Sequence, residues 1–224
     1  LYYAHTIYAH TIKCPAAKCC LGMTAKDLNS IELFRGHMTQ IKVNYTYEVL
    51  LLLVKREMHQ RELAKELKTS LTRVQSILAG LKAINVLDYK TEGKNHVYFI
   101  KKNLVSKSSL LNAENYKLAK LIRKYPVLEP MFMEIIEKCP QRMILLFGSY
   151  AKFIPKEHSD IDVYIGADYK IQAKIKERLR NIYHGLNIQA RKFNQDDLLI
   201  REIIKNHVIV HGGEEYYEKL EFFA

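Results

Sequence analysis

The chain has 224 residues, of which 48% are hydrophobic and 26% are charged, and its formal net charge is +11. This composition is typical of one large or two small globular domains and excludes disordered and fibrous proteins. No apolar run approaches the ~18 residues that a membrane span needs, so we expect no membrane segment. The positive charge lies in the front half, because residues 38–107 carry thirteen Lys and Arg against six Asp and Glu, whereas residues 143–224 carry twelve of each. A basic N-terminal half would attract the phosphate backbone of a nucleic acid, although a general role in solubility explains the charge equally well.

Residues 1–37 differ from the rest of the chain. Tyr3–Ile7 is repeated at once as Tyr8–Ile12, and no helical or alternating pattern persists. Gly36-His37-Met38 resembles the remnant of a cleavable tag, so we expect translation to begin at Met38 and 1–37 to be a cloning-derived leader or a disordered arm. The spacing of the three cysteines in this segment does not match a zinc site and indicates a reducing, cytoplasmic compartment: Cys14, Cys19 and Cys20.

The next segment predicts three helices. Apolar residues fall on one helical face in 45–56, a shorter helix is predicted over 62–67, and a third over 71–83. Thr69-Ser70 precede the third helix and supply an N-cap, whose side-chain oxygen accepts from free backbone N–H groups.

Two strand-like runs follow, Val86–Lys90 and Val97–Lys101. The six residues between them, 91–96, contain Gly93, which predicts a β-hairpin. The order helix, helix, capped helix, hairpin resembles the winged helix-turn-helix of prokaryotic transcription regulators over residues 45–102.

That resemblance implies that the third helix enters the major groove and that the hairpin tip contacts the backbone or minor groove of double-stranded DNA. The alternatives are a merely solvated helix face or a dimerisation module. By position, the residues implied in DNA contact are Ser70, Thr72, Arg73, Gln75 and Ser76 on the helix, and Lys90, Lys94 and Asn95 on the wing.

A helical connector is expected over 105–129. Asn112-Ala113-Glu114 opens a helical stretch, and Tyr125-Pro126 breaks it because proline disfavours helix in the residue before it. A further helix is predicted over Pro130–Lys138.

The chemically informative segment runs from Met143 to Ile165. An apolar run ends at Gly148-Ser149, and Ser159-Asp160-Ile161-Asp162 follows, leading into a second apolar run. In a strand, residues i and i+2 point the same way, so Asp160 and Asp162 share a face. Two such carboxylates repel unless a cation lies between them, and Mg²⁺ prefers oxygen ligands.

This pattern resembles the G-S-x-A-x-G…S-D-I-D signature of the polymerase-beta-like nucleotidyltransferase superfamily, most nearly its minimal nucleotidyltransferase branch. The resemblance covers about residues 130–218. It implies that Asp160 and Asp162 hold the Mg²⁺ (or Mn²⁺) of a bound triphosphate and act in catalysis. It also implies that the nucleotide contacts Gly148, Ser149, Lys152 and Ser159.

Two departures from the signature matter. Phe153 stands where the family has a second glycine, and Gln189 falls where a third carboxylate is expected on a later strand. A neutral amide binds a divalent cation less well than a carboxylate does. Asp196 and Asp197 are expected at the start of a helix instead.

We therefore expect an α+β protein with a winged helix-turn-helix over 38–104 and a mixed α/β nucleotidyltransferase-type domain over 130–224. One hypothesis is an enzyme that moves a nucleotide from an NTP, with ATP favoured, onto a hydroxyl. A protein such as a toxin is one candidate for the acceptor. The alternative is a DNA-binding transcriptional regulator whose nucleotidyltransferase domain is degenerate, sensing nucleotide or inactive. A homodimer is expected by analogy with winged-helix regulators.

Overall fold

The computed structural model describes residues 43–179 and 185–223. The expected leader, 1–37, and its three cysteines lie outside the described residues. No helix in the described ranges combines the length and the apolarity needed to cross a membrane.

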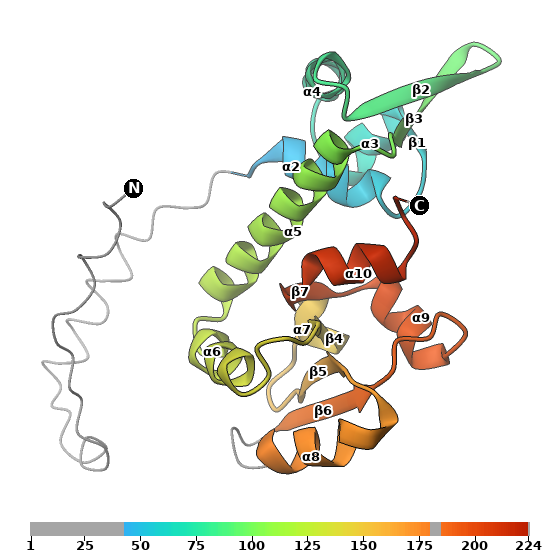
Figure 1. Ribbon diagram of the computed structural model, residues 1–224. Helices are drawn as coiled ribbons and strands as arrows, with labels where there is room; N and C mark the ends of the chain where they lie inside the picture. Colours follow the sequence, from blue (N-terminus) through green and yellow to red (C-terminus); the bar gives the residue numbers. More distant parts are fainter. Residues whose placement is uncertain (1–42, 180–184, 224) are drawn as a thin grey trace, which may run out of the picture. The chain divides into compact units, whose positions relative to one another are not determined.

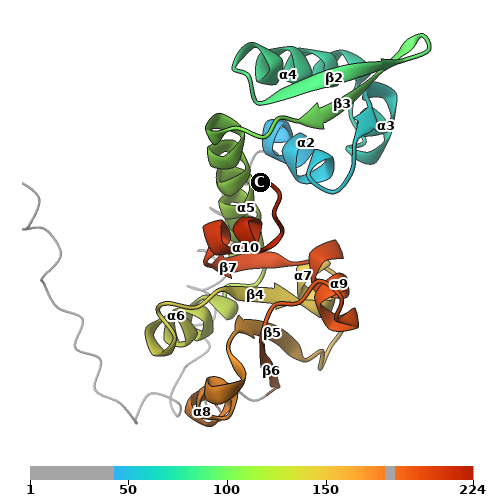
Figure 2. The ribbon, with the colours of Figure 1, turned by 45° about the vertical axis from the view of Figure 1, so that its right-hand side comes forward.

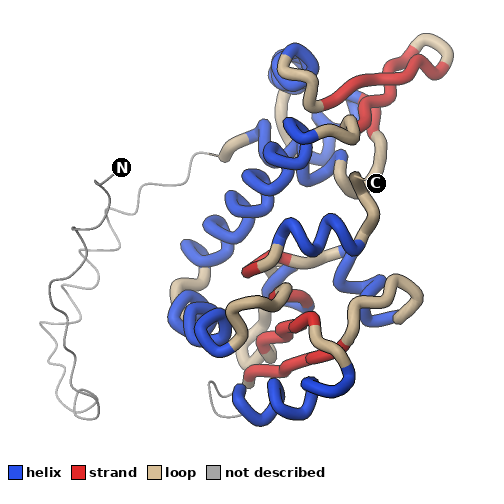
Figure 3. The backbone as a smooth tube through the Cα atoms, viewed as in Figure 1, coloured by secondary structure: helices blue, strands red, loops and turns tan. Residues whose placement is uncertain are grey.

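The first part of the described chain is a winged helix (Figures 1 and 3). Its short strands form one antiparallel sheet in the order β1-β3-β2. The elements in chain order are α2 (Tyr45–Leu53), β1 (Met58–His59), α3 (Gln60–Glu66), α4 (Leu71–Ala83), β2 (Leu87–Glu92) and β3 (Asn95–Ile100). The two-residue β1 has no signal of its own in the sequence, because it exists only through its pairing with β3.

Local signals define the ends of these elements. Oγ of Ser70 accepts from the backbone N–H of Arg73 at 3.3 Å and so caps α4 as predicted. The wing is tighter than expected: Glu92 pairs with Asn95, which leaves only Gly93-Lys94 in the turn, and Gly93 has a φ of +62°. Positive φ at this point is the conformation that glycine adopts without steric cost.

Two helices follow the winged helix, α5 (Leu104–Lys124) and α6 (Leu128–Lys138). The expectation that the first would begin near Asn112 is wrong, because α5 begins eight residues earlier. Asn103 caps it, with its Oδ1 accepting from the N–H of Ser106 at 2.8 Å. The helix ends at Tyr125-Pro126, where the sequence predicted a break.

The last part is a mixed four-stranded sheet in the order β6-β5-β4-β7 (Figure 2). The β5–β6 pair is parallel, and the other two pairs are antiparallel. The strands are β4 (Ile144–Phe147), β5 (Ile161–Gly166), β6 (Leu186–Arg191) and β7 (Val208–His211). The helices are α7 (Gly148–Ala151), α8 (Tyr169–Leu179), α9 (Leu198–Lys205) and α10 (Gly213–Lys219).

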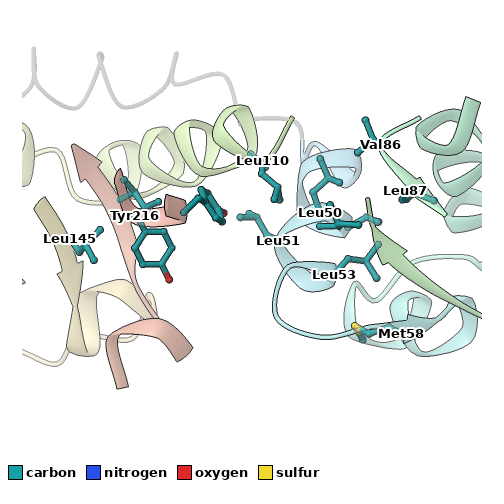
Figure 4. Packing of buried hydrophobic residues seen from close by; sticks show 14 of the residues in the cluster. Leu50, Leu51, Leu53, Met58, Val86, Leu87, Leu110, Leu145 and Tyr216 are labelled. Atoms are coloured by element: carbon teal, nitrogen blue, oxygen red, sulfur yellow. The ribbon is translucent and has the colours of Figure 1, made fainter. Parts of the chain in front are cut away.

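Alternate residues of β5 supply two different hydrophobic clusters, as the strand period requires. Val163 belongs to the cluster that contains the buried residues of α6 and α8. Tyr164 belongs to a second cluster, which contains the buried residues of α9 and α10 and continues into the winged helix. Figure 4 shows Leu51 of α2 between the winged-helix core and Tyr216 of α10. The described chain is thus an α+β structure whose two sheets are linked through one apolar cluster.

Candidate functional site

The turn after β4 comes so close to a carboxylate of β5 that only glycine fits. Gly148 has a φ of +72°, and a Cβ placed on it would lie 2.2 Å from Oδ2 of Asp162. The approach follows from strand pairing, because Phe147 pairs with Asp162 across the β4–β5 ladder. Glycine is therefore required both by the backbone conformation and by the contact. The structure brings the Gly148-Ser149 turn and the Asp162 carboxylate together.

Helix α7, which begins at this turn, has only four residues. It therefore offers the N–H groups of one turn, which lack intrahelical acceptors, rather than the macrodipole of a long helix. Ser149 is half-buried within it. What the turn can give an anionic group is a set of local donors.

Two carboxylates lie at the beginning of β5. Asp162 is the second residue of the strand and is half-buried, whereas Asp160 directly precedes the strand and is exposed. Oδ1 of Asp160 lies 3.8 Å from the position of a Cβ on Gly185, whose carbonyl accepts from the N–H of Ile161 at 2.9 Å. Asp160 thus lies beside the start of β6, and Asp162 lies beside the Gly148 turn.

The side chain next to Asp162 on the neighbouring strand is an amide, and the sequence analysis did not single it out. Asn187 pairs with Asp162 in the parallel β5–β6 register, and its Nδ2 donates to Oδ1 of Asp162 at 2.8 Å. Gln189 lies two residues further along the same face, and its Nε2 donates to Oδ1 of Asn187 at 3.1 Å. The register between β5 and β6, which cannot be read from the sequence, makes Asn187 rather than Gln189 the immediate neighbour of Asp162.

The chain of hydrogen bonds continues to the start of α9. The guanidinium of Arg191 donates to Oε1 of Gln189 at 3.0 Å and to Oδ2 of Asp197 at 3.1 Å. Asp197 caps α9, as expected for a helix-initiating residue, and accepts from the N–H of Leu199 at 2.8 Å. This backbone hydrogen bond, with the Arg191 contact, lowers the pKa of Asp197. The Asp197 carboxylate is thus engaged in capping α9 and in the ion pair with Arg191.

Phe153, at the position of the family's second glycine, keeps a glycine-like backbone. Its φ is +61°, in the left-handed region that a bulky residue rarely enters. Its carbonyl oxygen accepts from Nζ of Lys124 at 2.8 Å and from the hydroxyl of Tyr125 at 3.3 Å. The end of α5 therefore holds the turn in the conformation that glycine would adopt freely.

Two of the residues expected to contact a nucleotide have partners within the protein. Oγ of Ser159 accepts from the N–H of Lys156 at 2.8 Å, which closes the loop before β5. Nζ of Lys152 lies 3.5 Å from a carboxylate oxygen of Glu202 on α9, and the side chain is exposed. These contacts give Ser159 a structural role and leave Lys152 tethered at the edge of the site.

On the winged helix, all eight residues expected at DNA are exposed: Ser70, Thr72, Arg73, Gln75, Ser76, Lys90, Lys94 and Asn95. Several also have protein partners. Arg73 lies 4.9 Å from the ring centre of Tyr45 and donates to Oγ1 of Thr69 at 3.2 Å. Lys90 is paired with Glu57 at 2.5 Å, and this contact is the main reason that the pKa of Lys90 is raised.

Among residues 43–179 and 185–223, no three His, Cys, Asp or Glu side chains are arranged to hold a metal ion. Asp160 and Asp162 nevertheless carry carboxylate oxygens at the start of β5, the ligand type that Mg²⁺ prefers. Mg²⁺ commonly takes one or two protein carboxylates and completes its ligands with substrate phosphates and water.

Comparison with known proteins agrees with this geometry. Residues 134–215 match the sequence model of the family described as "Polymerase beta, Nucleotidyltransferase". The C-terminal part of this chain is a nucleotidyltransferase domain. A putative protein adenylyltransferase of Methanocaldococcus jannaschii is 40% identical over 73 residues, which are 32% of this chain. The matched residues span 56% of the length of that curated relative.

Two solved structures overlap with about half of the chain. The adhesin competence repressor AdcR of Streptococcus pyogenes is 19% identical, with a TM-score of 0.34, over 48% of this chain and 83% of its own. A mutant of ZitR from Lactococcus lactis is 17% identical, with a TM-score of 0.34, over 48% of this chain and 84% of its own. The winged-helix architecture itself follows from the element order and from the strand order β1-β3-β2.

Proposed function

We propose that this protein is a Mg²⁺-dependent nucleotidyltransferase that transfers the nucleoside monophosphate of an NTP, with ATP as the preferred donor, onto a hydroxyl group. The observation that carries the proposal is the contact between the Gly148 turn and the Asp162 carboxylate. Three neighbouring segments, β4, α7 and β5, bring together the backbone turn that we propose to bind phosphate and the carboxylate that we propose to bind metal.

In this proposal Asp160 and Asp162 hold the metal ion, and the amides of Gly148 and Ser149 with the Ser149 hydroxyl donate to the triphosphate. Bound Mg²⁺ neutralises charge on the phosphates and orients them. In the overall transfer, the acceptor oxygen forms a bond to the α-phosphorus, the bond from that phosphorus to the bridging oxygen breaks, and pyrophosphate leaves. The acceptor hydroxyl loses its proton.

The weak point of the site is the removal of that proton. The residue beside Asp162 is Asn187, and the next side chain on the same face is Gln189, so neither can act as a carboxylate base. This supports a second candidate, in which the domain binds nucleotide and transfers it slowly or not at all. The protein would then be a DNA-binding regulator that senses nucleotide.

Binding and transfer have to be measured separately to distinguish these candidates. ATP labelled at the α-phosphate is incubated with the protein, Mg²⁺ or Mn²⁺, and candidate acceptor proteins, and ATP labelled at the γ-phosphate is the parallel control. Nucleotidyl transfer leaves the α-label, but not the γ-label, on the acceptor. The double change Asp160→Asn/Asp162→Asn should abolish it without removing the side-chain volume.

The acceptor that we propose is a protein hydroxyl, with a toxin partner as the first candidate. The Methanocaldococcus jannaschii relative, named as a putative protein adenylyltransferase, supports this choice. An acceptor protein that gains the mass of one nucleoside monophosphate identifies the product. ATP binding without any α-label transfer in either metal would favour the nucleotide-sensing regulator instead.

We propose further that the winged helix binds double-stranded DNA as a homodimer and regulates transcription. Support comes from the eight exposed polar and basic residues on α4 and the wing and from the basic charge of residues 38–107. Affinity should fall steeply with salt as counterions are released. Arg73→Ala should weaken binding in a gel shift by about 10-fold or more, if Arg73 leaves Tyr45 to reach a base. Lys65→Ala, an exposed change on α3, is the control.

A further inference from the structure

A cavity of about 420 Å³ lies away from the nucleotide site, between α2, α5 and the C-terminal segment. Its volume is within the range of about 300–1,000 Å³ typical of small-molecule sites. Its walls are largely apolar and aromatic, and include Leu51, Val54, Tyr216, Tyr217 and Phe222. Two buried polar side chains, Glu114 and His207, also line it. The proposed nucleotidyl transfer uses neither of them.

One of the residues that line this cavity, Glu114, has an oxygen without a hydrogen-bond partner. The residue is only 3% exposed, and Oε1 accepts from the hydroxyl of Tyr217 at 3.2 Å. Oε2 has no hydrogen-bond partner, and the nearest cation, Nζ of Lys117, is 4.0 Å away. Burial raises the pKa of Glu114, although Lys117 opposes this effect. A buried carboxyl oxygen without a hydrogen-bond donor lowers the stability of the folded state, so a ligand that supplies a donor would be stabilised there.

His207 presents a second acceptor. Its Nδ1 lies 2.9 Å from the carbonyl oxygen of Ile203. The hydroxyl of Tyr216 also lies 3.3 Å from Nδ1. Because the carbonyl contact is the shorter one and a carbonyl can only accept, we assign the proton to Nδ1 and a lone pair to Nε2. Nε2 has no hydrogen-bond partner and lies 4.0 Å from Oε1 of Glu114. Burial and the nearby Lys117 lower the pKa of His207 to about 3, so the ring is neutral near pH 7.

The charges around these two acceptors disfavour a cationic ligand, although burial lowers the pKa of Lys117. Lys117 already donates to the carbonyl oxygen of His207, and both Lys117 and Lys55 line the cavity. A further positive charge would be repelled by these ammonium groups, and an anion would meet Glu114. The cavity is therefore matched by a neutral molecule with an apolar ring and a hydrogen-bond donor at its edge.

We propose that this cavity is a binding site for a small neutral aromatic molecule, whose N–H or O–H group donates to Oε2 of Glu114 and Nε2 of His207. The site is independent of the nucleotide-binding turn. It draws its walls from the winged helix as well as from the nucleotidyltransferase domain, because Leu51 and Val54 belong to the end of α2 and His207 directly precedes β7.

The decisive experiment compares two probes of nearly equal shape on the full chain. Indole carries one N–H donor, and 1-methylindole carries none. Isothermal titration calorimetry should give indole a dissociation constant about 10-fold lower, because only indole satisfies a buried acceptor. Equal affinities would mean that the cavity takes apolar molecules without the proposed hydrogen bond. No binding of either probe up to its solubility would mean that the cavity holds water. Either result overturns the proposal, and neither depends on a variant that must fold.

Two further measurements locate the site. Glu114→Gln replaces the acceptor oxygen by a donor of the same size, so the 10-fold preference for indole should disappear. Glu214→Gln makes the same chemical change at an exposed position of α10 and should leave the preference intact. In ¹⁵N spectra of the histidine rings, indole should shift Nε2 of His207 in the wild type. A preference unchanged in Glu114→Gln, with no shift at His207, would place the probe elsewhere and overturn the assignment.

Discussion

The nucleotide site and the cavity at the end of α2 both contain carboxylates, but they treat them differently. Asp162 has a neutral amide donor, Asn187, within 2.8 Å and remains half-exposed. Glu114 is 3% exposed, and one of its oxygens lacks a donor altogether.

The two carboxylates are positioned by different kinds of contact, local in one site and long-range in the other. Asp162 is placed by a strand and a glycine turn that are close in the sequence, so a short motif specifies it. Glu114 and His207 are separated by more than ninety residues of chain and meet only through packing. In our proposals, exposure keeps the first site open to a charged ligand and a metal ion, whereas burial restricts the second to neutral partners.

The largest effect is expected for Gly148→Ala, which adds a methyl group at the close contact between the Gly148 turn and Asp162. The added Cβ would overlap Oδ2 of Asp162, and alanine resists a φ of +72°. Nucleotidyl transfer, measured with α-labelled ATP, should fall by about 100-fold or more, since small misplacements at a reacting site have effects of this size. Gly80→Ala is the control, because a Cβ there meets nothing within 4 Å. Transfer at the wild-type rate in Gly148→Ala would remove this contact from the mechanism.

The next effect probes the buried region through pH. The folded-state pKa of His207 is about 3, whereas its unfolded value is about 6.5. The unfolded chain therefore binds a proton that the native state rejects as the pH falls below about 6.5. The free energy of unfolding is therefore highest, with respect to His207, above about pH 6.5. It should fall toward pH 3 by up to about 1.4 kcal/mol per pH unit. Urea unfolding between pH 6.5 and 4.5 should show a shallower loss in His207→Gln than in the wild type.

The matched control for this measurement is His158→Asn, at an exposed histidine with a φ of +66° that asparagine tolerates. Its pH slope should equal that of the wild type. Parallel curves for all three proteins would mean that His207 takes up a proton without unfolding, contrary to its burial.

A third test asks which strand position corresponds to the missing carboxylate. Asn187→Asp places a second carboxylate against Asp162, and Mn²⁺ affinity should rise about 10-fold, because the two repel unless a cation lies between them. Without metal the variant should lose about 1 kcal/mol, the size of such a repulsion in a wet site. Gln189→Glu, one step further along the face, should gain less. If Mn²⁺ affinity rises more in Gln189→Glu than in Asn187→Asp, the missing carboxylate corresponds to position 189, as the motif suggests, and not to position 187, as the strand register suggests.

The smallest effect concerns Phe153, whose backbone conformation is held by the end of α5. Phe153→Ala and Phe153→Gly both remove the ring, but only glycine adopts positive φ freely. The glycine variant should therefore be more stable than the alanine variant by about 1 kcal/mol in urea unfolding, the reverse of their order in a helix. The opposite order would mean that the turn relaxes out of the left-handed region when the ring is absent.

Local patterns predicted much of the fold and placed the Gly148 turn next to Asp162, where we propose the nucleotide site. The cap at Ser70, the third helix of the winged helix over 71–83 and the helix start at Asp197 all agree with the structure. The start of α5 was predicted wrongly, because an amphipathic pattern is weak around Asn103, where the capping side chain decides the boundary. The identity of the neighbour of Asp162 depended on a strand register that no local pattern contains.

By itself, the sequence determined that a glycine turn and two carboxylates belong to one nucleotidyltransferase element, because their spacing spans a single strand–turn–strand unit. Only the tertiary structure decided that Asn187 touches Asp162 and that Glu114 and His207 share a cavity. The physical reason is range. Backbone conformation and alternation act over a few residues and are written in order along the chain. Strand register and burial depend on contacts between distant segments, which are settled only when the chain packs.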